Sequence, residues 1–238
     1  MSKEVMNELA LFAGVGGGIL GSRLLGWRTV CAVEIEPYCR EVLLRRQEEK
    51  ILEAFPIWDD IRTFSGREWR GKVDVITAGF PCQPFSSAAH GNNPKESLFS
   101  EVVRVTNETR PGFVMLENVV GVKRHFRRIV SEFRGIDFSV VPPANIGASS
   151  VGAPHKRRRI WILAYSNSAR ESALQEYDET QGVSEAQERR VEWWDHPRMA
   201  RVYDGDAHRM DRIKATGNAQ VPGVVEVAWK VLTNVCSN

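Results

Sequence analysis

The stretch Asn7–Gly18 reads NELALFAGVGGG, an apolar run that passes directly into a cluster of glycines. The apolar half predicts a short strand over Asn7–Phe12, and the glycines predict a tight turn before a helix over Ile19–Leu25. A second strand is expected over Thr29–Val33, and Glu34 follows it. This order is the unit that brings backbone N–H groups close to a nucleotide. It predicts an α/β fold whose ligand site lies at the carboxyl ends of the strands.

The glycine spacing leaves the kind of nucleotide open. Gly16, Gly18 and Gly21 satisfy the G-x-G-x-x-G pattern of dinucleotide sites, and Glu34 stands where a carboxylate suits a ribose diol. A cofactor that contains adenosine is the second interpretation. Glycines that serve only close packing are the third.

A cysteine between two prolines lies in the stretch Gly79–Ser86, which reads GFPCQPFS. It follows Val73–Ala78, a short apolar run that predicts a buried strand. Each proline fixes its own φ and pushes the preceding residue into an extended conformation, so Cys82 cannot join a helix. The pattern favours a thiol presented at the carboxyl edge of the sheet. A small buried cysteine without chemical function is the alternative.

Two further acids follow predicted strands. Asp60 comes after the apolar residues Phe55–Trp58, and Glu117 comes directly after Phe113–Leu116. A turn or a helix cap explains Asp60 as well as a ligand contact does. Because burial raises the pKa of a carboxyl group, an acid that ends an apolar strand indicates a functional role for Glu117.

Basic residues gather in three places, the last of which holds Arg209, Arg212 and Lys214. Lys123–Arg128 predicts a basic helix surface, and His155–Arg159 reads HKRRR before a strand over Ile160–Leu163. Successive strand residues alternate sides, so Arg157 and Arg159 would share a face. A solvated surface is the usual meaning of such runs, but the second run enters a buried strand and favours contact with an anion or a base edge.

Three apolar stripes predict helices over Tyr38–Lys50, Ser97–Thr109 and Gly223–Leu232. The residues expected to face inward are Val42, Leu43, Ile51, Leu98, Phe99, Val102, Val105, Val224, Val227, Ala228 and Val231.

The chain has 238 residues, 42% of them hydrophobic, and a formal net charge of +2, which by itself does not indicate a nucleic-acid partner. Its four cysteines are far apart and lack zinc-ligand spacing, which favours a reduced setting and no metal. Glycines and Arg23 interrupt the apolar segment Leu9–Trp27, so it predicts soluble structure rather than a signal peptide or membrane span. We expect a cytoplasmic protein with a catalytic and cofactor-binding domain (1–165), a short variable lobe (166–206) and a returning segment (207–238).

In order and content, these motifs resemble those of the DNA (cytosine-5)-methyltransferases over nearly the whole chain. The matching stretches are Leu11–Gly17, Glu34-Ile35, Asp60-Ile61, Gly79–Ser86, Glu117–Val119, His155–Arg159 and Gly217–Pro222. The resemblance implies a Rossmann-like fold of the S-adenosylmethionine-dependent methyltransferases, with a mostly parallel sheet and a very small second lobe. It implies a short member of the family and leaves a phage or host origin open.

By this resemblance the cofactor is S-adenosylmethionine. Phe12 and Ile35 would enclose its adenine, Glu34 would bind the ribose, and Asp60 would bind the adenine amine. Backbone contacts or other cofactor-motif positions are implied for Gly14, Gly16, Gly17, Ile61, Leu98, Asn218 and Ala219.

The implied substrate is a cytosine flipped out of double-stranded DNA. Cys82 would attack C6 as a thiolate, helped by the charge of Arg157 or Arg159. Protonated Glu117 would bind N3, Arg159 the base carbonyl, and the backbone carbonyl of Phe80 the exocyclic amine. The candidates for filling the gap in the duplex or for contacting phosphate are Gln83, Ser86 and Ser87.

Three departures from the family pattern matter. Ala10 stands where many members have aspartate, His155 replaces a glutamine, and the variable lobe is short, which puts independent sequence recognition in doubt. A monomer is expected, and a cognate restriction endonuclease is a candidate partner.

Three rival functions stay open. A tRNA cytosine-5 methyltransferase would typically show Cys-Phe-Thr where this chain has Leu163–Ser166, so DNA is favoured. A nicotinamide-dependent oxidoreductase would explain the glycines but leaves Cys82 and Glu117 without a role. A non-catalytic binding module would not need the intact cysteine, acid and arginines.

Overall fold

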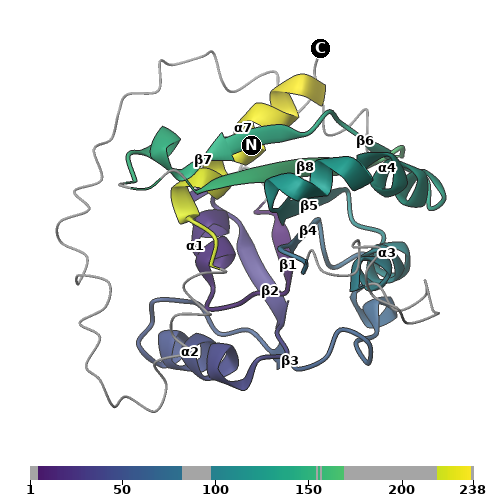
Figure 1. The fold of residues 1–238 in the computed structure, drawn as a ribbon. Helices are drawn as coiled ribbons and strands as arrows, with labels where there is room; N and C mark the ends of the chain where they lie inside the picture. Colours follow the sequence, from purple (N-terminus) through teal and green to yellow (C-terminus); the bar gives the residue numbers. More distant parts are fainter. Residues whose placement is uncertain (1–4, 82–97, 154, 156, 169–218, 237–238) are drawn as a thin grey trace, which may run out of the picture.

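The computed structural model describes residues 5–81, 98–153, 155, 157–168 and 219–236. These residues form an eight-stranded sheet (Figure 1). Four pairs of neighbouring strands are parallel and three are antiparallel, which confirms the predicted α/β fold with a mostly parallel sheet.

The parallel part of the sheet comes from the first half of the chain. Its strands are β1 (Asn7–Leu11), β2 (Arg28–Val33), β3 (Ile57–Trp58), β4 (Val75–Ala78) and β5 (Phe113–Asn118). β1 lies between β2 and β4, so the direction in which the chain adds strands reverses there. Open α/β sheets bind ligands at the carboxyl ends of the strands at such a reversal.

The other strands are β6 (Phe138–Val140), β7 (Ala144–Gly147) and β8 (Arg158–Ser166). β8 runs antiparallel to β5, β6 and β7. The order across the sheet is β3-β2-β1-β4-β5-β8-β6, with β7 paired to β8. Because β5 and β8 run in opposite directions, the arginines at the start of β8 reach the carboxyl end of β5.

Helices cover both faces of the sheet, as buried parallel strands require. They are α1 (Gly17–Leu24), α2 (Pro37–Glu48), α3 (Leu98–Thr109), α4 (Phe126–Arg134) and α7 (Pro222–Cys236). α3 and α4 bury residues such as Phe99 and Phe133 against one face. α7 packs on the other face and against α1, and the ring of its Trp229 lies 4.7 Å from that of Trp27. The prediction that the last helix docks on the main domain is confirmed.

Three short 3-10 helices complete the described part: η1 (Gly66–Trp69), η4 (Val120–His125) and η5 (Ala148–Val151). The predicted basic helix surface is thus divided between η4 and α4. No helix among the described residues is long and apolar enough to cross a membrane.

Two predicted inward positions are wrong. Ile51 is 43% exposed because α2 ends at Glu48, before it. Val231 is 42% exposed, and the buried side of α7 runs instead through Val224, Val225, Ala228, Trp229 and Leu232. Val225 and Trp229 thus belong to the buried side of α7 in place of Val231.

Candidate active site

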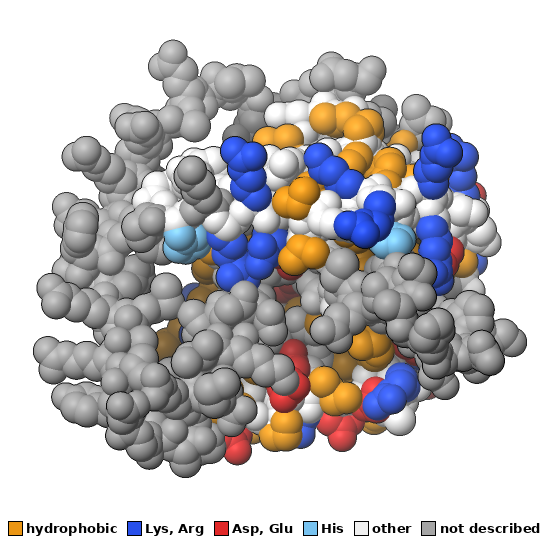
Figure 2. Space-filling model, in the orientation of Figure 1, with side chains coloured by type: hydrophobic (Ala, Val, Ile, Leu, Met, Phe, Trp, Pro, Cys, Tyr) orange, Lys and Arg blue, Asp and Glu red, His pale blue; other side chains and the backbone are white. Residues whose placement is uncertain are grey.

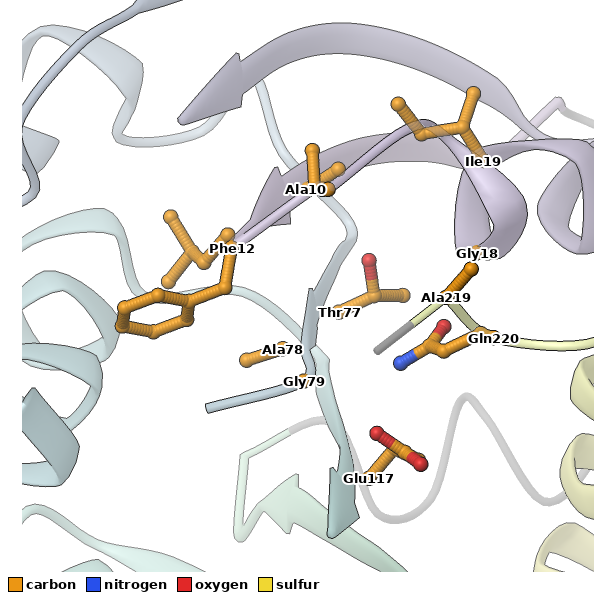
Figure 3. Close-up of a pocket in the computed structure, with 13 residues that line it drawn as sticks. Ala10, Phe12, Gly18, Ile19, Thr77, Ala78, Gly79, Glu117, Ala219 and Gln220 are labelled. Atoms are coloured by element: carbon orange, nitrogen blue, oxygen red, sulfur yellow. The ribbon is translucent and has the colours of Figure 1, made fainter. Parts of the chain in front are cut away.

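An open cavity lies at the carboxyl ends of β1, β4 and β5 (Figure 3). Its lining combines the glycine turn after β1, the end of β4, the acid at the end of β5 and the residues before α7. The lining residues are Ala10, Leu11, Phe12, Ala13, Gly14, Gly18, Ile19, Thr77, Ala78, Gly79, Glu117, Ala219 and Gln220.

The glycine turn depends on backbone conformations that glycine adopts readily. Gly14 and Gly16 have φ values of 54° and 85°, and Gly16 caps the start of α1. Phe12 also has a positive φ, 54°, which is uncommon for a residue with a side chain. Its half-buried ring lines the cavity, as expected for an adenine contact.

Glu34 holds this turn in place. Its Oε2 accepts a hydrogen bond from the backbone N–H of Gly14 at 2.6 Å, and its Oε1 accepts one from Glu36 at 2.8 Å. On the other side Arg46 of α2 donates to the carbonyl of Val15. The predicted ribose-binding acid is therefore beside the turn, with its oxygens already engaged by backbone.

Of the remaining predicted cofactor residues, Ala219 lines the cavity, whereas Ile35, Asp60, Ile61 and Leu98 do not. Ile35 is 53% exposed just after β2, whereas Ile61 is buried in the core. Asp60 accepts hydrogen bonds from the side chain of Arg62, the first cause of its lowered pKa. Leu98 begins α3 and packs partly against the core. Ala219 lines the cavity, and Asn218 is outside the described residues.

Glu117 and Arg159 come together at the inner end of the cavity. Nε of Arg159 lies 2.9 Å from Oε1 of Glu117, and their side chains are 22% and 9% exposed. Burial raises the pKa of Glu117; Arg159, then Arg157, and then a hydrogen bond from Gln220 oppose the rise. The predicted acid and guanidinium therefore meet.

A second cavity adjoins this pair, and the predicted common face of Arg157 and Arg159 is confirmed by it. Its lining residues are Glu117, Ala148, Arg157, Arg159, Trp161, Gln220, Val221 and Val224. Within the described structure, Nη2 of Arg157 and Nε1 of Trp161 are buried without hydrogen-bond partners. Burial lowers the pKa of Arg157. Both donors are thus available to a polar ligand or to water.

The backbone before the predicted catalytic loop is anchored by Asn118. Its Nδ2 donates to the carbonyl of Phe80 at 2.9 Å, and its Oδ1 accepts from the N–H of Val119 at 2.8 Å. The Phe80 ring is buried beside Phe99, with ring centres 5.2 Å apart. The carbonyl expected to bind the cytosine amine is therefore fixed in place. Four other predicted residues lie outside the described part of the chain: Cys82, Gln83, Ser86 and Ser87.

Sequence reasoning missed two residues of this site. Gln220 lines both cavities, and Thr77 lines the first while its hydroxyl binds a buried acid, Glu8. A long polar side chain between Ala219 and Val221-Pro222 was the only signal for Gln220. Thr77 gave none, because a threonine in a strand is ordinary.

Other proteins are similar to this chain in sequence and in fold. The family model described as C-5 cytosine-specific DNA methylase matches residues 6–227. The type II methyltransferase M.NgoMIV of Neisseria gonorrhoeae is 38% identical over 169 residues, which cover 68% of this chain and 52% of that protein. The type II methyltransferase M.CviJI of Paramecium bursaria Chlorella virus IL3A is 28% identical over 94% of this chain and 58% of its own length.

A similar solved structure is that of a protein described as a DNA modification methyltransferase encoded within a prophage of E. coli. It has a TM-score of 0.56 and 25% identity, and the match covers 68% of this chain and 47% of that one. The chain thus spans about half the length of the relatives that it matches.

Proposed function

This chain belongs to the family of C-5 cytosine-specific DNA methylases, and from that premise we propose that it transfers a methyl group from S-adenosylmethionine to C5 of a cytosine in DNA. The observation that carries the proposal is the position of Glu117. Glu117 lines the first cavity, the one beside the glycine turn, and it also pairs with Arg159. An acid in that position can act on a base held next to a cofactor.

The residues of the first cavity fit S-adenosylmethionine. The Gly14 and Gly18 backbone allows close approach, the Phe12 ring offers an aromatic surface, and Glu34 lies directly behind the turn. When bound there, the cofactor supplies an electrophilic methyl group. The Ala10 side chain offers no polar contact to the cofactor, so polar contacts at this end of β1 would come from the backbone of the turn.

The reaction begins with the chain's own residues. The Cys82 thiolate forms a bond to C6 of cytosine, and the electron pair of the C5–C6 double bond moves into the ring. Protonated Glu117 hydrogen-bonds N3 and stabilises that charge, while Arg159 binds the base carbonyl and the Phe80 carbonyl accepts from the exocyclic amine. C5 then carries the nucleophilic electron pair. After C5 has been methylated, its proton passes to solvent and the electron pair of that C–H bond re-forms the C5–C6 double bond. At the same time the bond between C6 and Cys82 breaks with its electron pair returning to sulfur, which restores the aromatic ring and the thiolate.

The cytosine must leave the duplex for these contacts to form, at a cost of roughly a few kcal/mol. We assign phosphate contacts to the exposed basic residues Lys123, Arg124, Arg127 and Arg128 of η4 and α4. Figure 2 shows lysine and arginine side chains spread over the part of this face where Figure 1 places β8 and α4. We further propose a cytoplasmic monomer, paired with a restriction endonuclease as the type II names of its relatives suggest.

The test is methyl transfer from labelled S-adenosylmethionine to duplex DNA and to tRNA, assayed side by side. Bisulfite sequencing of DNA from cells that express the protein would give the target context. Transfer to DNA that Glu117→Gln abolishes supports the proposal. Transfer to RNA alone would show the tRNA activity instead, and NAD binding without any response to S-adenosylmethionine would favour the oxidoreductase.

A further inference from the structure

Gln220 lines both cavities: the first, which lies beside the glycine turn, and the second, which Arg157 and Arg159 also line. It lies two residues before the start of α7, the helix that packs against α1. Glu117 is the other residue common to both cavities. Gln220 is therefore placed between the predicted cofactor site and the predicted base-binding groups.

Three glycines from two different strand ends pack against Gln220. A Cβ atom on Gly17 would collide with the backbone carbonyl of Gln220, and one on Gly18 would collide with its Oε1. A Cβ atom on Gly79 would lie 3.0 Å from its Nε2. Gln220 thus contacts the turn after β1 and the end of β4, the strand that leads into Phe80 and Pro81.

The side-chain amide of Gln220 is directed to Glu117. A hydrogen bond joins the two side chains, and Figure 3 shows the amide nitrogen pointing toward the carboxyl group. Oε2 of Glu117 lies 3.2 Å from the same Cβ position of Gly79 that is 3.0 Å from Nε2 of Gln220. Because Arg159 binds Oε1, the carboxyl group is held by donors from two separate parts of the chain.

We propose that Gln220 is a positioning residue, whose amide fixes the orientation and the proton affinity of the Glu117 carboxyl group at the wall of the cofactor cavity. This inference rests on the proposed function, in which protonated Glu117 acts on the base. The close contact with Gly18 ties the same side chain to the cofactor turn, and the backbone carbonyl of Gln220 lies against Gly17.

The charged groups around Glu117 determine which effect Gln220 should have on the pKa of that carboxyl group. Among the described residues, the charged groups that act on Glu117 are Arg159 and Arg157, whereas Gln220 and Gly79 are neutral. An N–H that donates to a carboxylate favours the ionised form, so the Gln220 amide lowers the pKa that burial raises. Removing the donor should therefore raise the pKa of Glu117.

The direct test is the titration of Glu117 in the full chain without DNA. Carboxyl-carbon NMR of protein labelled at glutamate would follow it, and the signal lost in Glu117→Gln identifies it. In Gln220→Met, which keeps the side-chain length, the titration should move to higher pH by about one unit. Gln220→Glu should move it further, since two carboxylates would then be adjacent.

Gln47→Met is the matched control, because Gln47 of α2 donates to the Phe55 carbonyl, away from Glu117. It should leave the titration of Glu117 unchanged. If Gln220→Met did not fold, Gln220→Glu would still test the inference, since it preserves the volume of the side chain. An unchanged Glu117 titration in a folded Gln220 variant would overturn the positioning role whatever the methylation result.

Kinetic measurements then distinguish the positioning of Glu117 by Gln220 from a role of Gln220 in binding S-adenosylmethionine. In Gln220→Met, kcat should fall by about 10²-fold from misplacement of the acid, and the fall of kcat at high pH should begin at higher pH. The Kd of S-adenosylmethionine, measured by calorimetry, should change little. A weaker Kd with an unchanged kcat would overturn the inference. A wild-type protein that transfers no methyl group would instead refute the proposed function and leave the Glu117 titration measurable.

Discussion

Nε of Arg159 lies 2.9 Å from Oε1 of Glu117, although the two residues come from distant parts of the chain. The antiparallel pairing of β5 and β8 explains the contact, since Glu117 is opposite Trp161, and Arg159 precedes Trp161 by two residues and shares its face. Burial raises the pKa of Glu117, and Arg159 is the largest influence that opposes the rise. Burial thus favours the protonated form of the acid, which suits a group that must donate to a base.

Arg159→Ala should lower the rate of methyl transfer by about 10²–10³-fold, the usual effect of removing one group that stabilises a developing charge. The variant should still fold, because Glu117 without its cation can bind a proton instead of remaining charged. Single-turnover methyl transfer and thermal unfolding measure the two effects. Arg158→Ala is the matched control, since Arg158 is exposed and faces the other side of β8. Equal losses in both variants would contradict a specific role for Arg159.

Cys82→Ala should abolish methyl transfer, by about 10⁶-fold if the residue is the nucleophile. The described part of the chain already lines the cofactor cavity with residues such as Phe12, Gly14 and Gly18, so binding of S-adenosylmethionine should persist. Duplex DNA that carries 5-fluorocytosine provides a second measurement, because fluorine at C5 cannot leave as a proton does. Wild-type protein should form a complex with this DNA that survives denaturing electrophoresis, and Cys82→Ala should form none. A stable complex in the variant would show that another residue is the nucleophile.

The strand ends could be predicted from the sequence because parallel strands are short, apolar and followed by polar residues. β1, β2, β4 and β5 all lie where apolar runs predicted them, and Glu117 is in the expected cavity. The glycine turn was equally predictable, since its spacing is imposed by backbone geometry.

Long-range pairing could not be predicted in the same way. β7 (Ala144–Gly147) carries only one strongly apolar residue, Ile146, and forms because β8 offers it an open edge. The role of Gln220 depends on three glycines and an acid that are close only after α7 has docked. A polar residue before a helix has no local signal for such contacts.

Glu8 should make stability depend on pH. It is fully buried in β1, and its carboxyl group accepts hydrogen bonds from Ser22, Thr29 and Thr77 at 2.7, 2.7 and 2.6 Å. Burial raises its pKa above the ordinary value of 4.5, so the folded state binds a proton that the unfolded state has released. The Glu8 contribution to stability is therefore complete below about pH 4.5 and declines as pH rises through the raised pKa.

Glu8→Gln keeps a neutral hydrogen-bonding group and should remove this decline. Urea unfolding at several pH values should show the two proteins close to equal near pH 4 and the variant relatively more stable at higher pH. Glu53→Gln, at an exposed position, should change stability by no more than about 0.5 kcal/mol at any pH. Parallel pH profiles for wild type and Glu8→Gln would contradict the prediction.

Gly17→Ala and Gly18→Ala should differ in whether a second substitution can rescue them. A Cβ on Gly17 meets the backbone carbonyl of Gln220, whereas a Cβ on Gly18 meets the end of its side chain. Each alanine should cost about 1–3 kcal/mol of unfolding free energy through overpacking. Gln220→Ala removes the side-chain atoms but not the carbonyl, so it should recover most of the loss in Gly18→Ala and little of that in Gly17→Ala. Double-mutant cycles by urea unfolding measure the two coupling energies. Equal coupling energies at Gly17 and Gly18 would contradict the prediction that Gly17 contacts the backbone of Gln220 and Gly18 its side chain.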